Sequence, residues 1–225
     1  MSSLADGFDH PIFRESIRRI RELLGETGLV GVERELLERL VHSSGDPAIA
    51  PWLRFSAGAC ERGMEALAAG AVILTDTAMA ASAVAPMARR TFANPVHSVL
   101  EWAPVQAPPG GTRTAVGMER ALAAHPAAVV LIGSAPTALE LLLQQVGPGV
   151  QGGAPAPALV IGMPVGFVGV AESKRRLAAA DLPQIRLEGS RGGAALVAAA
   201  ANALLRRAWL DRQGGPPASP GACSA

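Results

Sequence analysis

His42 is a residue whose type and position suit proton transfer. It lies in the stretch ERLVHSSGD, at the end of an amphipathic helix predicted over residues 33–42 and directly before a small polar turn. Imidazole titrates near neutral pH and can act as an acid. The carboxyl end of a helix carries partial negative charge, which favours the protonated ring. From the residues alone, His42 is either such an acid or a packed or surface histidine.

Glycine-rich turns follow three apolar runs of the sequence and open the helices that come next. Helix starts of this kind present free N–H groups and the positive end of the dipole, which favour anions. Full positive charges lie nearby at Arg113, Lys174 and Arg191. We therefore predict a site for a ligand with several carboxylates or phosphates. Its backbone part is expected at Gly133, Gly166, Gly189 and Gly192.

Asp76 and Thr77 end another apolar run, AVILTDT, and precede a helical stretch. A carboxylate in this place either contacts a ligand or caps the following helix, because both roles use its oxygens as acceptors. The sequence leaves both interpretations open.

Composition and motifs exclude several classes of function. The formal net charge of the 225 residues is +1, which argues against a nucleic-acid partner. The motifs G-x-x-x-x-G-K-[ST] and G-x-S-x-G do not occur, and the one match to G-x-G-x-x-G, at residues 147–152, follows a predicted helix rather than a strand. Cys60 and Cys223 form neither a disulfide framework nor a metal-ligand spacing, so we predict no metal site.

Short continuous runs rich in Val and Ile alternate with helical patterns along the chain. Five runs are typical of buried parallel strands, at residues 71–77, 96–102, 128–134, 158–165 and 184–190. Helices are predicted over residues 12–24, 33–42, 56–69, 78–90, 114–124, 136–146, 171–180 and 192–208. This alternation predicts an α/β fold, with three α/β/α layers around a central, mainly parallel five-stranded sheet in a single domain. Ligands bind at the carboxyl ends of strands in such folds.

The ends of the chain differ in composition from its middle. We expect a flexible N-terminus over residues 1–10, one domain over 11–209 and a disordered tail rich in Gly, Pro, Ser and Ala over 210–225. No secretory pattern is present, and the apolar run at 192–205 is too short to span a bilayer. The expected location is the cytoplasm, with no membrane partner.

Six motifs occur in a fixed order between about residue 10 and residue 207: LVHSSGD, AVILTDTAM, GTRTA, IGSAPTAL, ALVIGMPVGFVGVAESK and GSRGGAALVAAAANAL. In order and spacing they resemble the precorrin isomerase family, the precorrin-8X methylmutases of cobalamin biosynthesis. The resemblance implies a layered α/β/α domain around a five-stranded parallel sheet. It also implies a homodimer whose active site lies at or near the subunit interface, with neighbouring cobalamin-pathway enzymes as further candidate partners.

The family's reaction moves a methyl group between adjacent carbons of ring C of a corrinoid. The resemblance implies that precorrin-8X becomes hydrogenobyrinate, or that cobalt-precorrin-8 becomes cobyrinate, without a cofactor. The family's histidine corresponds to His42, which is taken to protonate the macrocycle. The resemblance and the basic turns together predict seven substrate-binding residues. They are Ser16, Arg39, Asp76, Thr77, Arg113, Lys174 and Arg191.

Several positions depart from the family's motifs, and three of them lose a hydrogen-bonding group. Ser134 stands where the family usually has Asn, Ser190 where it has a basic residue, and Ala194 where it has Ser. The lost groups are hydrogen-bonding groups, each with a net contribution of about 1 kcal/mol. The main alternative is therefore a diverged paralogue that binds corrinoids without turnover. A third hypothesis is an unrelated enzyme for organic anions on the same scaffold.

Overall fold

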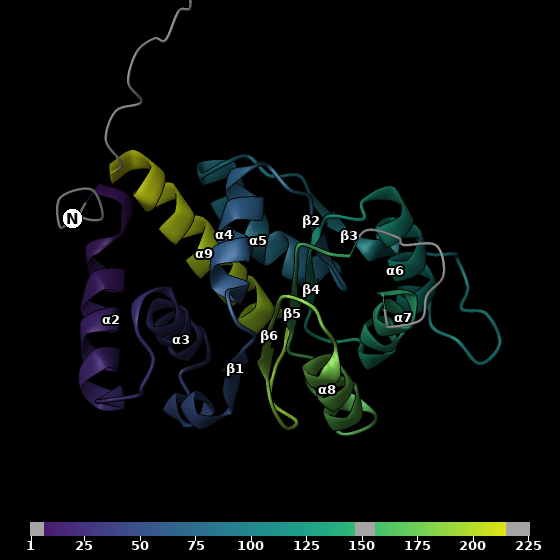
Figure 1. Ribbon diagram of the computed structural model, residues 1–225, viewed down its shortest axis with the longest axis horizontal. Coiled ribbons are helices and arrows are strands. Elements are labelled where there is room, and N and C mark those ends of the chain that lie inside the picture. Colours follow the sequence, from purple (N-terminus) through teal and green to yellow (C-terminus); the bar gives the residue numbers. More distant parts are fainter. Residues whose placement is uncertain (1–6, 147–155, 215–225) are drawn as a thin grey trace, which may run out of the picture.

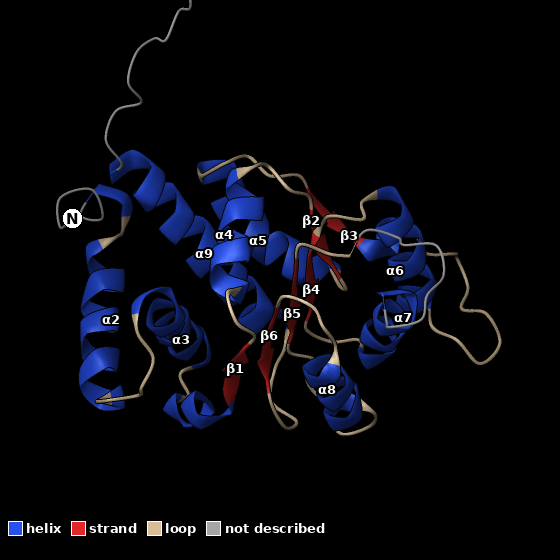
Figure 2. Cartoon of the chain, in the orientation of Figure 1, coloured by secondary structure: helices blue, strands red, loops and turns tan. Residues whose placement is uncertain are grey.

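The buried apolar runs of the sequence form one central sheet (Figure 2). The computed structural model describes residues 7–146 and 156–214. Both faces of the sheet are covered, and every residue of its two middle parallel strands, Val129–Ile132 and Leu159–Gly162, is buried. Burial on both faces explains why these strands read as unbroken apolar runs. The strands are β1 (Leu53–Phe55), β2 (Ile73–Thr75), β3 (Val96–Ser98), β4 (Val129–Ile132), β5 (Leu159–Gly162) and β6 (Gln184–Leu187).

The strand order is β1-β6-β5-β4-β2-β3, and the five predicted strands form its parallel part. The prediction of a five-stranded sheet is wrong in the number of strands, because β1 adds a sixth. β1 pairs antiparallel with β6, with Leu53 opposite Leu187 and Phe55 opposite Ile185, so the sheet is mixed. β1 reads Leu-Arg-Phe directly after a proline-containing 3-10 helix, so it has no continuous apolar run of the kind that marks the other strands.

Eight α-helices surround the sheet within the described residues. Figure 1 shows them in layers on both sides of the strands. They are α2 (Pro11–Leu24), α3 (Gly31–Ser44), α4 (Ala59–Ala68), α5 (Ala78–Arg90), α6 (Arg113–Ala124), α7 (Pro136–Val146), α8 (Val170–Ala179) and α9 (Ala194–Gly214). Two 3-10 helices, η1 (Pro47–Trp52) and η2 (Val99–Glu101), connect elements.

The side chains of the strands alternate between two apolar cores, as expected for a pleated sheet. Val129 and Leu131 belong to a core that also contains residues of α3, α4, α5 and α9, whereas Val130 and Ile132 belong to a core with residues of α6, α7 and α8. The predicted three-layer α/β/α arrangement is confirmed in this respect.

α2 and α3 lie outside the layer formed by α4, α5 and α9 (Figure 1). Leucines of α3 are fully buried in the core shared with the alanine-rich α9, whose small side chains permit close approach. α2 contains no buried residue and is the most peripheral of these helices. In the segment after α3, the Asp46 side chain accepts a hydrogen bond from Ala48 N at 2.9 Å, with Pro47 at the first position of η1.

The limits of the domain differ slightly from the sequence prediction. α9 continues to Gly214, so residues 210–214 of the expected tail are helical. Residues 1–6 and 215–225 lie outside the described residues. Among the described helices, none is sufficiently long and apolar to cross a membrane.

Candidate active site

His42 lies in the last turn of α3, where α2 holds its imidazole ring. α3 ends at Gly45, which adopts the left-handed conformation (φ 67°) and donates its N–H to Val41 O at 2.8 Å. On the facing helix, Ser16 Oγ lies 2.8 Å from His42 Nδ1. The ring of Phe13 meets the imidazole edge to face, with centroids 5.1 Å apart. The remaining ring nitrogen, Nε2, is therefore the one available to a ligand.

The electrostatic environment of His42 differs from the sequence prediction. Partial burial of the ring, and secondly the positive charge of Arg39, lower the pKa of His42 below its ordinary value. Both effects oppose the helix dipole, which favours the imidazolium. These effects favour the neutral form of the ring in the free protein.

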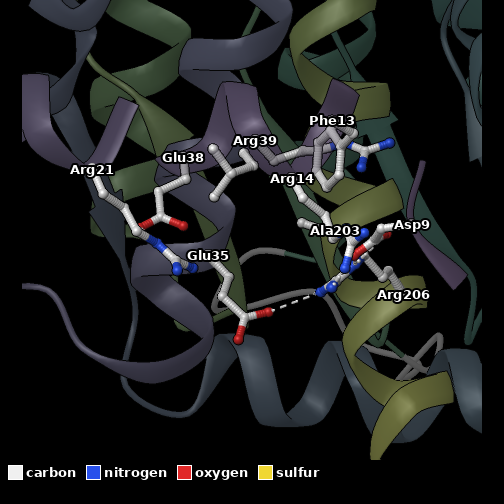
Figure 3. Close-up of a pocket in the computed structure, with 10 residues that line it drawn as sticks. Asp9, Phe13, Arg14, Arg21, Glu35, Glu38, Arg39, Ala203 and Arg206 are labelled. Carbon is white, nitrogen blue, oxygen red and sulfur yellow. Dashed lines mark hydrogen bonds and ion pairs between the residues drawn. The ribbon is translucent and has the colours of Figure 1, made fainter. Parts of the chain in front are cut away.

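Arg39 lies one turn before His42 on α3 and is partly buried. Its guanidinium carbon lies 4.6 Å from the centroid of the Phe13 ring, so Phe13 contacts both Arg39 and His42. Arg39 also lines a cavity of about 270 Å³ between α2, α3 and α9 (Figure 3). The lining residues are Asp9, Phe13, Arg14, Ile17, Arg21, Glu35, Glu38, Arg39, Ala203 and Arg206.

The acidic residues of this cavity are paired with arginines other than Arg39. Arg206 Nε contacts the two carboxylate oxygens of Asp9 at 2.9 and 3.0 Å. Arg206 also pairs with Glu35 at 3.3 Å, the contact drawn across the cavity in Figure 3. Glu38, which is buried, pairs with Arg21 at 2.8 Å. The cavity is therefore lined by many charged side chains, but ion pairs between them neutralise most of the charge.

Sequence reasoning missed this ion-pair network. Asp9 and Arg206 are 197 residues apart in the chain, and only the fold brings the segment before α2 to α9. One local signal was present, namely a glutamate at position 38 among the leucines of an apolar helix face. A charged residue in such a position must be paired to be tolerated.

Asp76 and Thr77 hold backbone turns at the carboxyl edge of the sheet. The buried Asp76 carboxylate accepts hydrogen bonds from Ser134 N at 2.6 Å and Ala135 N at 2.8 Å. Burial raises the pKa of Asp76 in spite of these bonds. Asp76 thus supports the turn before α7 rather than the helix that follows it in sequence. Thr77 caps that helix, α5, by accepting from Ala80 N at 3.3 Å.

The glycine turns pack against one another, backbone to backbone. A Cβ atom on Gly192 would lie 1.9 Å from Met163 O, and one on Gly133 would lie 2.7 Å from Ala194 N. Hydrogen bonds join the same turns: Val165 N donates to Gly133 O, Gly193 N to Met163 O and Gly166 N to Ser190 O. Gly166 and Gly189 have positive φ angles of 138° and 74°. These glycines bring the turns after β4, β5 and β6 into one compact edge.

Lys174 is directed into this edge rather than toward solvent. It is 2% exposed, and its Nζ donates to Gly189 O at 2.8 Å and Arg191 O at 2.6 Å. Burial lowers the pKa of Lys174 to about 8. Lys174 therefore fixes the turn that carries the glycines and Arg191.

The two exposed arginines of the predicted site lie in different places. Arg191 donates to Ala48 O at 2.8 Å and lies 3.7 Å from the Asp46 carboxylate, which joins the turn after β6 to the segment that follows His42. Arg113 begins α6, on the other face of the sheet from α3, and its Nε donates to Pro104 O at 2.8 Å. The structure therefore groups Ser16, Arg39 and His42, connects them to Arg191, and leaves Arg113 apart.

Comparison with known proteins agrees with this arrangement of motifs. A family profile described as precorrin-8X methylmutase (CbiC) matches residues 11–207. The chain belongs to the precorrin-8X methylmutase family. It is 39% identical to the cobalt-precorrin-8 methylmutase of Synechocystis sp., over 90% of this chain and 98% of the relative. It is 43% identical to the precorrin-8X methylmutase of Pseudomonas aeruginosa, over 86% of this chain and 93% of the relative.

A solved structure extends the similarity to the fold of the precorrin-8X methylmutase family. The precorrin-8X methylmutase of Thermus thermophilus superposes with a TM-score of 0.79 and 38% identity, covering 88% of this chain and 98% of that one. The resemblance predicted from the six motifs is confirmed. Membership of the precorrin-8X methylmutase family argues against an unrelated enzyme for organic anions.

Proposed function

We propose that this protein is an isomerase that converts precorrin-8X to hydrogenobyrinate, or cobalt-precorrin-8 to cobyrinate, by moving a methyl group within ring C. Two similar relatives carry the names of these two activities. The observation that carries the proposal is the position of His42, whose ring is oriented by Ser16 and Phe13 beside a cavity lined by Arg39.

His42 is the proposed proton donor. A methyl shift between adjacent ring carbons of a conjugated macrocycle needs neither a nucleophile nor a redox partner, and no cofactor is required. It needs a fixed orientation of the ring and a proton that favours the shift. As an imidazolium, His42 donates Nδ1–H to Ser16 Oγ and presents Nε2–H to the macrocycle.

The carboxylates of the macrocycle are proposed to bind the arginines and the glycine turns. Arg39 and Arg191 lie on the His42 side of the molecule, and Arg113 reaches the ligand from α6. Gly133, Gly166, Gly189 and Gly192 shape the backbone edge that the macrocycle faces. Three further residues contribute to substrate binding indirectly, by fixing the turns that they hold. They are Lys174, Asp76 and Thr77. The cavity beside Arg39 is at the small end of ligand sites, so it accepts one carboxylate side chain rather than the ring system.

The proposed assembly is a homodimer in the cytoplasm with the active site near the subunit interface. The turn after β5 supports this proposal, because it exposes apolar side chains beside the glycine edge. Phe167 is 95% exposed and Val168 is 88% exposed. Side chains of this kind are buried when a second copy covers them.

The experiment is an anaerobic visible-absorption time course with purified protein and precorrin-8X, repeated with cobalt-precorrin-8. We expect wild-type protein to produce the spectrum of hydrogenobyrinate or cobyrinate, and His42→Ala to lose turnover. His125→Ala, at the end of α6, is the control histidine variant. A stoichiometric spectral shift without turnover would instead establish the corrinoid-binding paralogue suggested by Ser134, Ser190 and Ala194. Equal turnover by His42→Ala would remove His42 from the mechanism.

A further inference from the structure

Arg39 is a partly buried cation whose nearest acidic charge, that of Asp9, attracts it without forming an ion pair with it. Within the described ranges, 7–146 and 156–214, no hydrogen bond or ion pair involves Arg39, and its guanidinium contacts the Phe13 ring. Burial lowers the pKa of Arg39, because the charged guanidinium loses hydration when it is held away from water. An anion that enters the cavity would offset that cost.

The neighbouring acids are already engaged. Asp9 is held by Arg206, and Glu35 by Arg206 and Arg207. Buried Glu38 is bound by Arg21 and Arg34. A carboxylate for Arg39 must therefore come from a bound molecule or from displacement of one of these pairs.

Arg39 and His42 are coupled by their positions on α3. They are three residues apart, which places them on the same face of the helix, and both contact Phe13 of α2. Other charges surround the pair: Arg14 of α2 and Arg206 of α9 line the cavity with Arg39. Beyond His42, Asp46 is paired with Arg191. The charge that acts directly on His42 is that of Arg39, and it opposes protonation.

We propose that a carboxylate of the bound corrinoid pairs with Arg39, and that this pairing makes His42 a proton donor only when substrate is present. The inference rests on the proposed function and adds a substrate-dependent control of its acid. Neutralisation of Arg39 removes the repulsion on His42, and the imidazole takes one proton from solvent. His42 gives that proton to the macrocycle, and the macrocycle releases one proton after the methyl group has moved, so the isomerisation consumes no proton overall.

The first test measures protonation of His42 by NMR in the free protein and with hydrogenobyrinate, the unreactive product, as the probe. In wild-type protein we expect the pKa of His42 to rise when hydrogenobyrinate binds. In free Arg39→Gln we expect it to lie above the wild-type value, and to respond less to the probe. Arg39→Lys keeps the positive charge and should retain the low value and the response.

Two outcomes separate failure of this inference from failure of the proposed function. Turnover of precorrin-8X by wild-type protein, with no rise in the pKa of His42 upon hydrogenobyrinate binding, would overturn the inference and leave the function intact. Absence of turnover and of hydrogenobyrinate binding would overturn the function itself. If Arg39→Gln fails to fold, the wild-type titration and Arg39→Lys still decide. We also expect Arg39→Gln to lower kcat/KM by about 10- to 100-fold, the effect of losing one hydrogen bond to a charged group.

Discussion

Ser16 Oγ lies 2.8 Å from His42 Nδ1, so α2 orients the proposed acid of α3. The contact joins two helices that are separated in the sequence by the turn after Leu24. It fixes one ring nitrogen and leaves the other for the substrate. Ser16 is in this sense a positioning residue for His42.

Replacement of this hydroxyl tests the positioning role. We expect Ser16→Ala to lower kcat by about 3- to 10-fold, the effect of one neutral hydrogen bond, while KM changes little. Ser16→Thr keeps the hydroxyl and should restore most of the rate. Steady-state kinetics with precorrin-8X measures both constants. A Ser16→Ala variant with raised KM and unchanged kcat would show that Ser16 binds substrate instead of orienting His42.

The pH dependence of turnover should report the lowered pKa of His42. A general acid must be protonated, so activity falls as the pH rises through its pKa. The profile of kcat/KM reflects the free enzyme, and we expect its falling limb below the ordinary histidine value of 6.5. The limb of kcat, which reflects the bound state, should lie at higher pH. If the falling limbs of the kcat/KM and kcat profiles coincided, control of the protonation of His42 by substrate would be contradicted.

Lys174 gives a stability prediction whose sign follows from its lowered pKa. The folded-state value is about 8, against an ordinary value of 10.5, so the unfolded chain binds more protons between these values. Stability contributed by Lys174 is therefore lost as the pH falls from about 10 to 8. We expect wild-type protein to gain on the order of 2 kcal/mol relative to Lys174→Met as the pH is raised across this window.

Urea unfolding of both proteins at several pH values measures that difference. The comparison with Lys174→Met cancels the titration of other groups. A difference that stays constant from pH 8 to 10, or that has the opposite slope, would mean that the two carbonyl acceptors stabilise the ammonium more than burial opposes it.

Gly192 and Gly189 provide a matched pair in one turn. Gly192→Ala would place a Cβ atom 1.9 Å from Met163 O, a backbone atom that can move only with its strand. We expect this variant to lose about 3 kcal/mol or more of unfolding free energy. Gly189 has open space around it and a φ of 74°, so Gly189→Ala should lose about 1 kcal/mol from backbone strain alone. Thermal or urea unfolding distinguishes the two, and equal losses would contradict the packing of these turns.

Much of the fold follows from the sequence because buried parallel strands leave a strong signal. Residues 129–132 and 159–162 are apolar at nearly every position since both faces of the sheet are covered. β1 leaves no such signal, because Arg54 interrupts its apolar residues and its partner β6 lies far along the chain. Sequence reasoning therefore finds the parallel core and misses the antiparallel edge.

The candidate site is predictable where it depends on motifs and unpredictable where it depends on packing. His42 is a candidate from its type and position, Ser16 is one through the family resemblance, and their contact agrees with a shared site. The pairing of Asp9 with Arg206 could not be found, because it joins the two ends of the chain. Lys174 was expected to face the ligand, but only the structure shows its ammonium enclosed by two carbonyl oxygens.

The peripheral position of α2 has a consequence for the temperature range of the enzyme. α2 buries no residue completely, so its local opening requires less free energy than unfolding of the sheet and α9. Opening removes Ser16 and Phe13 from His42 while the rest of the domain stays native. Thermal inactivation would then precede the calorimetric transition and be reversible on cooling, with the working range set by one surface helix.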